Sequence, residues 1–454
     1  MRRTIRGSAL FFYLGAIASM TALFASVPLV LAVDAGVDGW RYALLGFMTV
    51  LGASQLASAL ANWLSALLTT PHPLPRMDFS DGLPASFRSL VVIPTLLTSE
   101  DRIDELLESL EVRFLGNRDD HLHFGLLTDF SDAAQESLSE DEPLLRRARN
   151  GIEQLNAKYS SRAADRFFLL HRPRRWNAGG TGLDGLRAQA RQACGSQRAA
   201  ARQGPRPLLA HRGRRRRVVR TCEYVITLDT DTQLPRESAR QFVGTMAHPL
   251  NRPRYDEAGG RVAGRATASC SRAWARACPE HSVRATRSSS ASEPGIDPYT
   301  RTVSDVYQDL FGEGSFIGKG IYDVDAFERA LDGRFPENRI LSHDLLEGCY
   351  ARSGLLSDVH LYEDYPARYE ADMSRQAALD PRRLADRALA AAARSGPGRQ
   401  SLPESVCRRF RAGRSWTTCA GASSPAALLL LFLFGWFASP HAALTGRSPL
   451  RVSS

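Results

Sequence analysis

Two carboxylates stand one residue apart directly after a run of strand-forming residues, in the segment Tyr224–Pro235. Tyr224–Leu228 is typical of a buried strand, and Asp229 and Asp231 follow it. Open α/β sheets bind ligands at the carboxyl ends of their strands. A hard divalent cation such as Mg²⁺ or Mn²⁺ takes one or two carboxylates plus substrate phosphates. The segment therefore predicts a metal and diphosphate site. A simple polar turn is the alternative for an isolated Asp-x-Asp.

A second candidate segment is Asp309–Asp325, DLFGEGSFIGKGIYDVD, whose glycines let the backbone approach a ligand closely. It does not fit a phosphate-binding loop of the G-x-x-x-x-G-K-[ST] kind. Glu313 stands where the first glycine is needed, and Gly320 stands where a hydroxyl is needed. A sugar-binding loop fits better, with Gly314 and Ser315 as candidate substrate contacts.

A third candidate is Ser342-His343-Asp344, which is expected to open a helix with Ser342 as N-cap. Asp344 would lie near the positive end of the helix dipole. As a catalytic base it would remove a proton from an acceptor hydroxyl, and His343 would contact substrate. The alternative is that Asp344 only stabilises the start of the helix.

The elements that must position these residues alternate between strands and helices. Apolar runs predict strands, apolar residues at helical spacing predict helices, and Asp129 follows the second strand. The strands are expected at Ser89–Pro94, His123–Thr128 and Arg166–His171, and the helices at Glu100–Leu115 and Asp132–Ser160. The alternation indicates an α/β fold with a doubly wound, mainly parallel sheet. In such a sheet Asp129 and Asp229 converge on one edge.

Long apolar runs flank this soluble part. Arg-rich Met1–Gly7 precedes an uncharged run from about Ala9 to Val33, and a second run covers Tyr42 to about Leu68. Each is long enough to cross a bilayer, although a signal peptide is an alternative for the first. The positive-inside rule keeps Met1–Gly7 in the cytoplasm and returns the chain there after the second span. Pro425–Leu444 is a third candidate span, with a buried helix as the alternative. The expected domains are residues 1–70 (two spans), 71–84 (linker), 85–400 (soluble) and 425–444 (span).

The charge of the chain has an uneven distribution. The 454 residues carry a formal charge of +10, and the sequence pI is about 9.5. Ala178–Cys222 contains eleven arginines and one acid, Asp184, so this stretch alone carries the net charge. A nucleic-acid partner is therefore not expected. The seven cysteines lack the spacing of a metal knuckle.

Six segments together resemble the cytoplasmic glycosyltransferase domain of bacterial cyclic β-1,2-glucan synthases, which is close to the processive family-two transferases of GT-A fold. They are SLVVIPTLLTS, HFGLLTDFSDA, LLHRPRRWN, YVITLDTDTQLPR, SEPGIDPYTRTVSDVYQDLFGEGSFIGKGIYDVDAFERAL and RILSHDLLEGCYARSGLLSDV, and they cover most of Ser89–Ala371. The resemblance implies that Asp129 contacts the uracil side of UDP-glucose, that Asp229 and Asp231 form the metal and diphosphate motif, with Asp231 favoured over Asp229 as the metal ligand, and that Asp344 is the general base. It implies an inverting hexosyltransferase that extends a glucan at the bacterial inner membrane.

Three stretches depart from this family: Ala178–Arg220, Val262–Ala291 and Gln376–Ser423. They are rich in Arg, Ala, Gly and Ser, and they contain five of the seven cysteines. One reading is disordered basic insertion. The other is translation out of frame, because codons for Leu183–Ala193, read one base later, can encode WMGYERKRGK, similar to the family's basic donor-binding segment. Shifted codons for Ala266–Ala273 likewise give YGILQPRV, another segment of the family. Shifted codons after Arg375 give the family's R-x-x-R-W signature. The chain as written is then expected to fold poorly and to be inactive.

Two other functions remain open. A related transferase could make a β-glucan of another linkage. A non-catalytic basic membrane protein could bind nucleic acid or anionic lipid through Arg212–Arg217. The oligomeric state is not predicted. Full-length relatives continue into a phosphorylase-like domain that controls product length.

Overall fold

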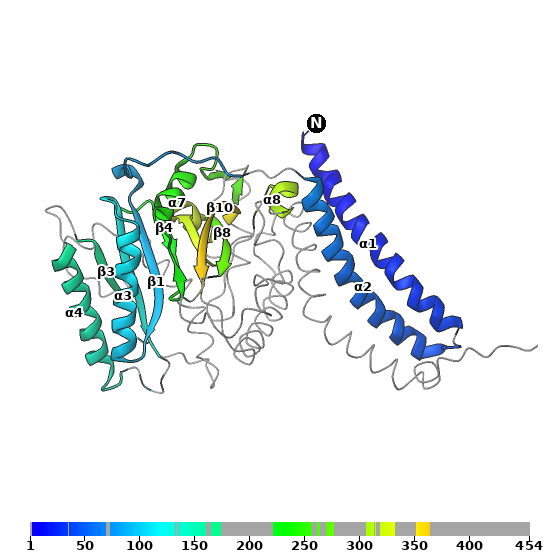
Figure 1. Cartoon of the computed structure of the whole chain (residues 1–454), viewed down its shortest axis with the longest axis horizontal. Helices are drawn as coiled ribbons and strands as arrows, with labels where there is room; N and C mark the ends of the chain where they lie inside the picture. The colour runs from blue at the N-terminus through cyan, green and yellow to red at the C-terminus, as the bar shows by residue number, and fades with distance from the viewer. Residues whose placement is uncertain are drawn as a thin grey trace, which may run out of the picture. The chain divides into compact units, whose positions relative to one another are not determined.

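The computed structural model describes residues 2–34, 36–69, 73–131, 133, 135, 137–159, 165–172, 174, 221–256, 261–263, 269–276, 306–312, 314, 318–331 and 351–363. The chain divides into two compact units (Figure 1). One comprises Met1–Thr70 with Ala390–Ser454, and the other is Pro71–Leu389, which contains the sheet. The domain boundaries expected from the sequence stay a prediction. Of the three atypical stretches, Ala178–Arg220 and Gln376–Ser423 lie outside the described residues.

The first unit contains two long apolar helices, α1 (Arg2–Asp34) and α2 (Gly39–Leu68). Phe11–Asp34 and Gly39–Ser65 have mean hydropathies of 2.1 and 1.6, and both are long enough to cross a membrane. The Tyr13 hydroxyl donates a hydrogen bond to Asn62 Oδ1 at 2.5 Å, which joins the two helices. The two predicted N-terminal apolar helices are thus confirmed. The predicted span Pro425–Leu444 lies outside the described residues.

The second unit is built on an eight-stranded sheet with the order β3-β2-β1-β4-β9-β8-β10-β5. β1 (Ser89–Leu97), β2 (Leu122–Phe130), β3 (Phe167–Arg172) and β4 (Tyr224–Thr227) form a parallel half. α3 (Glu100–Gly116) and α4 (Asp141–Tyr159) connect its first three strands. This half confirms the predicted α/β fold with a mainly parallel sheet.

The other half mixes strand directions. β9 (Gly320–Asp323) runs antiparallel to both β4 and β8 (Ser269–Arg276). β10 (Ser353–Glu363) runs parallel to β8. The short β5 (Thr232–Gln233) pairs antiparallel with the last residues of β10. The remaining elements are η1 (Ala85–Phe87), α7 (Ser238–Ala247), α8 (Val306–Phe311), α9 (Val324–Leu331) and a two-stranded sheet of β6 (Arg254–Asp256) and β7 (Arg261–Ala263). β8 lies within the atypical stretch Val262–Ala291, so part of that stretch joins the sheet.

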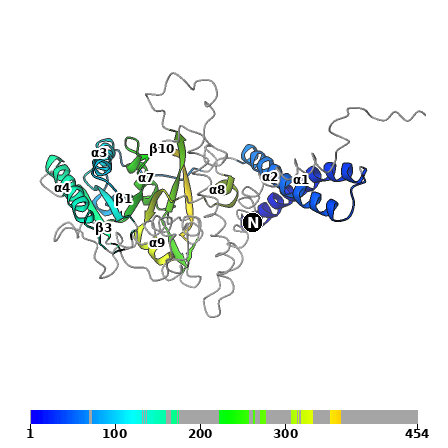
Figure 2. The same cartoon turned by 90° about the horizontal axis from the view of Figure 1, so that it is seen from below.

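Alternate residues of the central strands enter two cores because both faces of the sheet are covered. Val91 and Ile93 of β1 belong to a cluster with α3, α4 and α7 on one face. Leu90 and Val92 belong to a cluster with α9 on the other face. Figure 2 shows these helices around the strands, with α3 and α4 beside β1 and β3. This coverage explains why the parallel strands read as continuous apolar runs.

The helix predicted to begin at Asp132 begins at Asp141 instead. The positions described between 132 and 141 are not helical. The Asp141 carboxylate accepts a hydrogen bond from the Leu138 backbone N–H at 2.7 Å, and it pairs with Arg174 at 2.8 Å. Both contacts fix Asp141 at the start of α4, so the predicted start was wrong by nine residues.

Candidate donor-binding site at the strand tips

The strand order changes direction between β1 and β4, because the chain passes from β1 to β2 and β3 on one side and later adds β4 on the other. Ligands of open α/β sheets bind outside the carboxyl ends of the strands at such a switch point. Asp129 lies at the end of β2, and Asp229 and Asp231 directly follow β4. Because only β1 separates β2 from β4, these two strands lie two strand spacings apart, about 10 Å, and Asp129 and Asp229 share one edge of the sheet. The structure therefore brings these predicted residues to one edge.

The segment after β4 forms a tight turn that exposes both of its carboxylates. The Thr232 N–H donates to Asp229 O at 3.2 Å, which closes the turn. Leu228 is fully buried before the turn and Thr232 is fully buried after it, whereas Asp229 and Asp231 are exposed. The turn is thus anchored at both ends, and the two acids are accessible from solvent.

Arg113, on α3, donates hydrogen bonds to the backbone carbonyls of this turn. Its guanidinium donates to Thr232 O at 2.6 and 3.0 Å and to Thr230 O at 2.9 Å. Burial lowers the pKa of Arg113 to about 10, and the nearby Asp231 carboxylate opposes that shift. Arg113 remains charged near neutral pH, so a buried cation supports the Asp-Thr-Asp turn.

Lys319 pairs with the first acid of the turn. Its Nζ lies 2.8 Å from Asp229 Oδ2, and the Lys319 side chain is 8% exposed against 54% for Asp229. β9 runs antiparallel to β4 and pairs Thr227 with Gly320, so the start of β9 lies at the tip of β4. Gly318 and Gly320 have φ of +82° and +131°, which L side chains rarely adopt. Two glycines thus turn the chain on either side of this lysine.

Sequence reasoning missed Arg113 and Lys319. The Gly-Lys-Gly triplet was a signal for Lys319, but its place beside β4 depends on an antiparallel pairing over some ninety residues. Nothing local marks Arg113, which lies among the residues of an ordinary amphipathic helix.

Asp129 is 7% exposed and is held by its neighbours. It forms an ion pair with Arg172 at the end of β3, whose Nε lies 3.1 Å from Asp129 Oδ2. Its other oxygen accepts the Phe130 N–H at 3.2 Å. Arg174 donates to Ser131 O at 2.9 Å and so fixes the chain just beyond Asp129. These contacts orient the carboxylate.

Gly314 has a structural reason to be glycine. A Cβ there would lie 2.6 Å from the Leu355 backbone N, and the Gly314 N–H already donates to Ser353 O at 2.7 Å. The glycine therefore lets this loop pack directly on β10. A role in substrate binding stays a prediction. Ser315, His343 and Asp344 lie outside the described residues.

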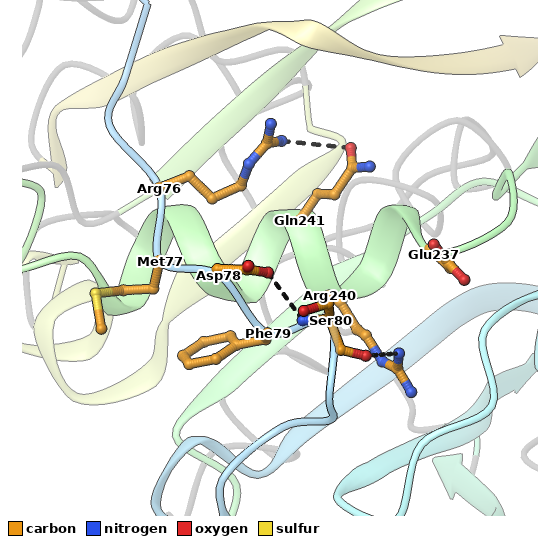
Figure 3. A pocket seen from close by; sticks show the side chains of 8 residues that line it. All are labelled: Arg76, Met77, Asp78, Phe79, Ser80, Glu237, Arg240 and Gln241. Carbon is orange, nitrogen blue, oxygen red and sulfur yellow. Dashed lines mark hydrogen bonds between the residues drawn. The ribbon is translucent and has the colours of Figure 1, made fainter.

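A hollow of about 350 Å³ lies elsewhere, between residues 76–80 and α7 (Figure 3). Arg240 crosses it to Ser80 O at 2.9 Å and pairs with Asp119 at 3.0 Å, just before β2. Because Asp119 precedes β2, the hollow lies near the amino-terminal ends of the parallel strands, and none of Asp129, Asp229 and Asp231 lines it. Part of the expected linker thus packs along α7, where the Met77 N–H donates to Gly244 O at 3.0 Å.

The acidic turn fits a metal that arrives together with a phosphate ligand. Among the described residues, no three His, Cys, Asp or Glu side chains gather as a metal site. Mg²⁺ commonly binds through one or two carboxylates plus substrate phosphates and water. Asp231, and Asp229 on the side away from Lys319, can supply such ligands.

Comparison with known proteins gives one curated relative. The chain is 41% identical over 335 residues to the cyclic β-(1,2)-glucan synthase NdvB of Rhizobium meliloti (strain 1021). The match covers 72% of this chain and 11% of that protein, so the chain corresponds to a small part of its relative's length. No protein-family model matches the chain. The resemblance predicted from the sequence is confirmed.

Two crystal structures of TarS from S. aureus are also similar to the chain. The structure of TarS 1–349 has 12% identity and a TM-score of 0.30, and the alignment covers 66% of this chain and 65% of that one. A second TarS structure has 14% identity and the same TM-score of 0.30, with coverage of 65% and 39%.

Proposed function

We propose that this chain, which resembles part of a cyclic β-(1,2)-glucan synthase, is a membrane-bound glucosyltransferase. It transfers glucose from UDP-glucose to a growing β-1,2-glucan with inversion, in a domain of GT-A type. One observation carries the proposal: the acidic turn lies at the switch point of the sheet, within the segment shared with the glucan synthase. A match over 72% of the chain includes Asp229–Lys319 wherever it begins.

In this proposal each carboxylate at the strand tips has its own role. Asp129, oriented by Arg172, accepts hydrogen bonds from the uracil side of the donor. Asp231 and Asp229 face the diphosphate, and a bound Mg²⁺ or Mn²⁺ supplies neutralising charge for the departing UDP. Asp344 takes the proton from the attacking 2-hydroxyl. Attack in line with the departing UDP inverts the α-linked donor into a β linkage.

The two apolar helices support membrane association. The proposed location is the bacterial inner membrane, in a multi-pass arrangement. Arg2, Arg3 and Arg6 precede the first span, which favours a cytoplasmic N-terminus and returns the chain to the cytoplasm after the second span. This orientation places the transferase unit where nucleotide sugars are available.

The test uses the full chain purified in detergent, both as written and with the three atypical stretches restored to the alternative frame. Each is incubated with radiolabelled UDP-glucose, Mn²⁺ and a β-1,2-glucan acceptor, and Asp231→Asn is the control. The proposal is supported if radiolabel enters polymer in the unsubstituted chain and not in Asp231→Asn, and if methylation analysis finds 1,2-linked glucose in that polymer. Another linkage supports the related transferase instead. No transfer and no UDP affinity in either chain, with steeply salt-dependent binding to nucleic acid or anionic lipid, overturns it.

A further inference from the structure

We propose that Arg174 is a positioning residue for recognition of the donor's base. By fixing the chain directly after β2, it sets the direction in which the Asp129 carboxylate faces. The inference rests on the proposed function, in which Asp129 accepts hydrogen bonds from uracil. It goes beyond that function because it assigns base selectivity to a residue that acts through Asp129.

Arg174 lies two residues beyond β3 and joins that strand to the chain that follows β2. Its guanidinium donates to Ser131 O at 2.9 Å and to Gln135 O at 3.4 Å. It also donates to both oxygens of the Asp141 carboxylate, at 2.8 and 3.0 Å, where α4 begins. One side chain therefore contacts three points along the chain that leads from β2 to α4.

The burial of the Arg174–Asp141 pair makes it persistent. The two side chains are 9% and 11% exposed. The Asp141 carboxylate also accepts the Leu138 N–H at 2.7 Å, so backbone and guanidinium both stabilise its charge. Breaking a buried pair by removing one partner is costly, because the other charge is left in the interior without compensation. Arg174 is thus held in place at the end that contacts Asp141.

Phe130 links this arrangement to Asp129. The Arg174 guanidinium carbon lies 5.3 Å from the centre of the Phe130 ring, and the buried His171 imidazole packs edge-on against the same ring at 4.4 Å. The Phe130 N–H donates to Asp129 Oδ1 at 3.2 Å. Because the ring of Phe130 and the carbonyl of Ser131 are both held, the N–H that orients the Asp129 carboxylate has a fixed direction.

The donor's base can offer this carboxylate only one N–H group. In a uridine nucleotide N1 is bonded to ribose, so N3–H is the only hydrogen-bond donor of the ring. A hydrogen bond from N3–H to a charged carboxylate depends strongly on its length and angle. A shift of Asp129 should therefore weaken recognition of the base, whereas contacts of the diphosphate with the turn after β4 should persist.

The experiment compares UDP with 3-methyl-UDP, which lacks the N3–H, by calorimetric titration in the presence of Mn²⁺. It uses the full chain in detergent, as written and restored to the alternative frame. Arg174→Met should weaken UDP binding about tenfold and 3-methyl-UDP binding less than about twofold. In an Asp129→Asn background the same change should alter UDP affinity less than about twofold, because the hydrogen bond that Arg174 orients is already impaired.

Arg166→Met is the matched control. The Arg166 side chain is also 9% exposed, pairs with Asp120, and donates to two backbone carbonyls at 2.8 and 2.9 Å. It lies directly before β3, at the opposite end of that strand from Arg174, so its loss should leave UDP affinity unchanged. If Arg174→Met does not fold, the double variant with Asp141→Asn removes both charges of the buried pair and must show the same nucleotide pattern. Failure of both variants to fold would assign Arg174 to folding alone and overturn the inference.

Three binding results would also overturn it. They are equal losses of affinity for UDP and 3-methyl-UDP in Arg174→Met, unchanged UDP affinity in that variant when folded, and a full additional loss in the Asp129→Asn background. Absence of UDP binding from both unsubstituted chains would overturn the proposed function and the inference with it. UDP binding with the wrong pattern among the variants overturns only the inference.

Discussion

Replacing Arg113 with methionine tests whether a buried guanidinium supports the acidic turn. The variant keeps much of the aliphatic stem but removes the donors to the carbonyls of Thr230 and Thr232. Hydrogen bonds to a charged group contribute about 1.5–3 kcal/mol each, so two carbonyls lose about 3–6 kcal/mol. Burial of the guanidinium is itself unfavourable, because it lowers the pKa of Arg113 from its usual range to about 10, and the methionine variant removes that cost. That relief is worth about 3 kcal/mol. The difference between the two contributions is a loss of about 0–3 kcal/mol of unfolding free energy, about 1.5 kcal/mol at the midpoint.

Pulse proteolysis across a urea gradient measures this loss in the full chain in detergent. The matched control is Arg102→Met on the same helix, because Arg102 is half exposed and its ion pair within the described part of the chain is with Glu105 on the surface. That control should change the unfolding free energy by less than about 0.5 kcal/mol. Hydrogen exchange of residues 228–236 should accelerate in Arg113→Met alone. Equal urea midpoints and equal exchange in the two variants would refute the supporting role of Arg113.

Three further predictions concern pH and packing. Burial raises the pKa of Asp323 from 3.8 to about 6, so the stability that its protonated form gives is full below about pH 4 and is lost as pH rises through 6. The unfolding free energy of Asp323→Asn should therefore rise by about 3 kcal/mol relative to the wild type between pH 4 and 7.5. A difference in urea midpoint between the two proteins that stays the same at both pH values would contradict this. Burial lowers the pKa of His123 from 6.5 to about 4, so the folded state holds this side chain neutral where the unfolded state would protonate it. As pH falls from 6.5 to 4, the unfolding free energy of the wild type should drop by about 3 kcal/mol relative to His123→Leu, which acid unfolding curves measure. Gly244→Ala would place a Cβ 2.5 Å from the Met77 carbonyl and should destabilise by about 1–3 kcal/mol. Gly151→Ala would place its Cβ against both methyls and the Cγ of the half-buried Leu107, a side chain that can rotate away. It should therefore destabilise less than Gly244→Ala, whose neighbour is backbone, and equal urea midpoints for the two glycine variants would be the wrong result.

Local sequence was sufficient for the parallel half of the sheet. The apolar runs that became β1, β2 and β3 are continuous because both faces are covered, and Ser99 caps α3 as its side chain accepts the Arg102 N–H at 3.3 Å. The start of α4 was missed because Asp141 is fixed by Arg174, a contact between distant residues.

The positions of the candidate residues were predicted only where they follow strands directly. Asp129, Asp229 and Asp231 were placed at strand ends because a strand that ends in a carboxylate is visible in the sequence. Lys319 was not, since its place depends on β9 entering the sheet antiparallel beside β4. Pairing of this kind is decided by the assembled core and not by neighbouring residues.

The position of β1 in the middle of the parallel half has a consequence for the order of folding. In the β1–β2 pair Ser89 lies opposite Leu122, whereas in the β1–β4 pair it lies opposite Tyr224, roughly four times as far along the chain. Closing the longer loop costs about 1.2 kcal/mol more, so β4 is expected to dock after β2 and β3. During synthesis one edge of β1 therefore stays unpaired until Tyr224 emerges, and an unpaired apolar edge invites association with other chains. The switch point of the sheet is formed only when β4 pairs with β1, so a chain interrupted before β4 is expected to aggregate, not to persist as a partial transferase.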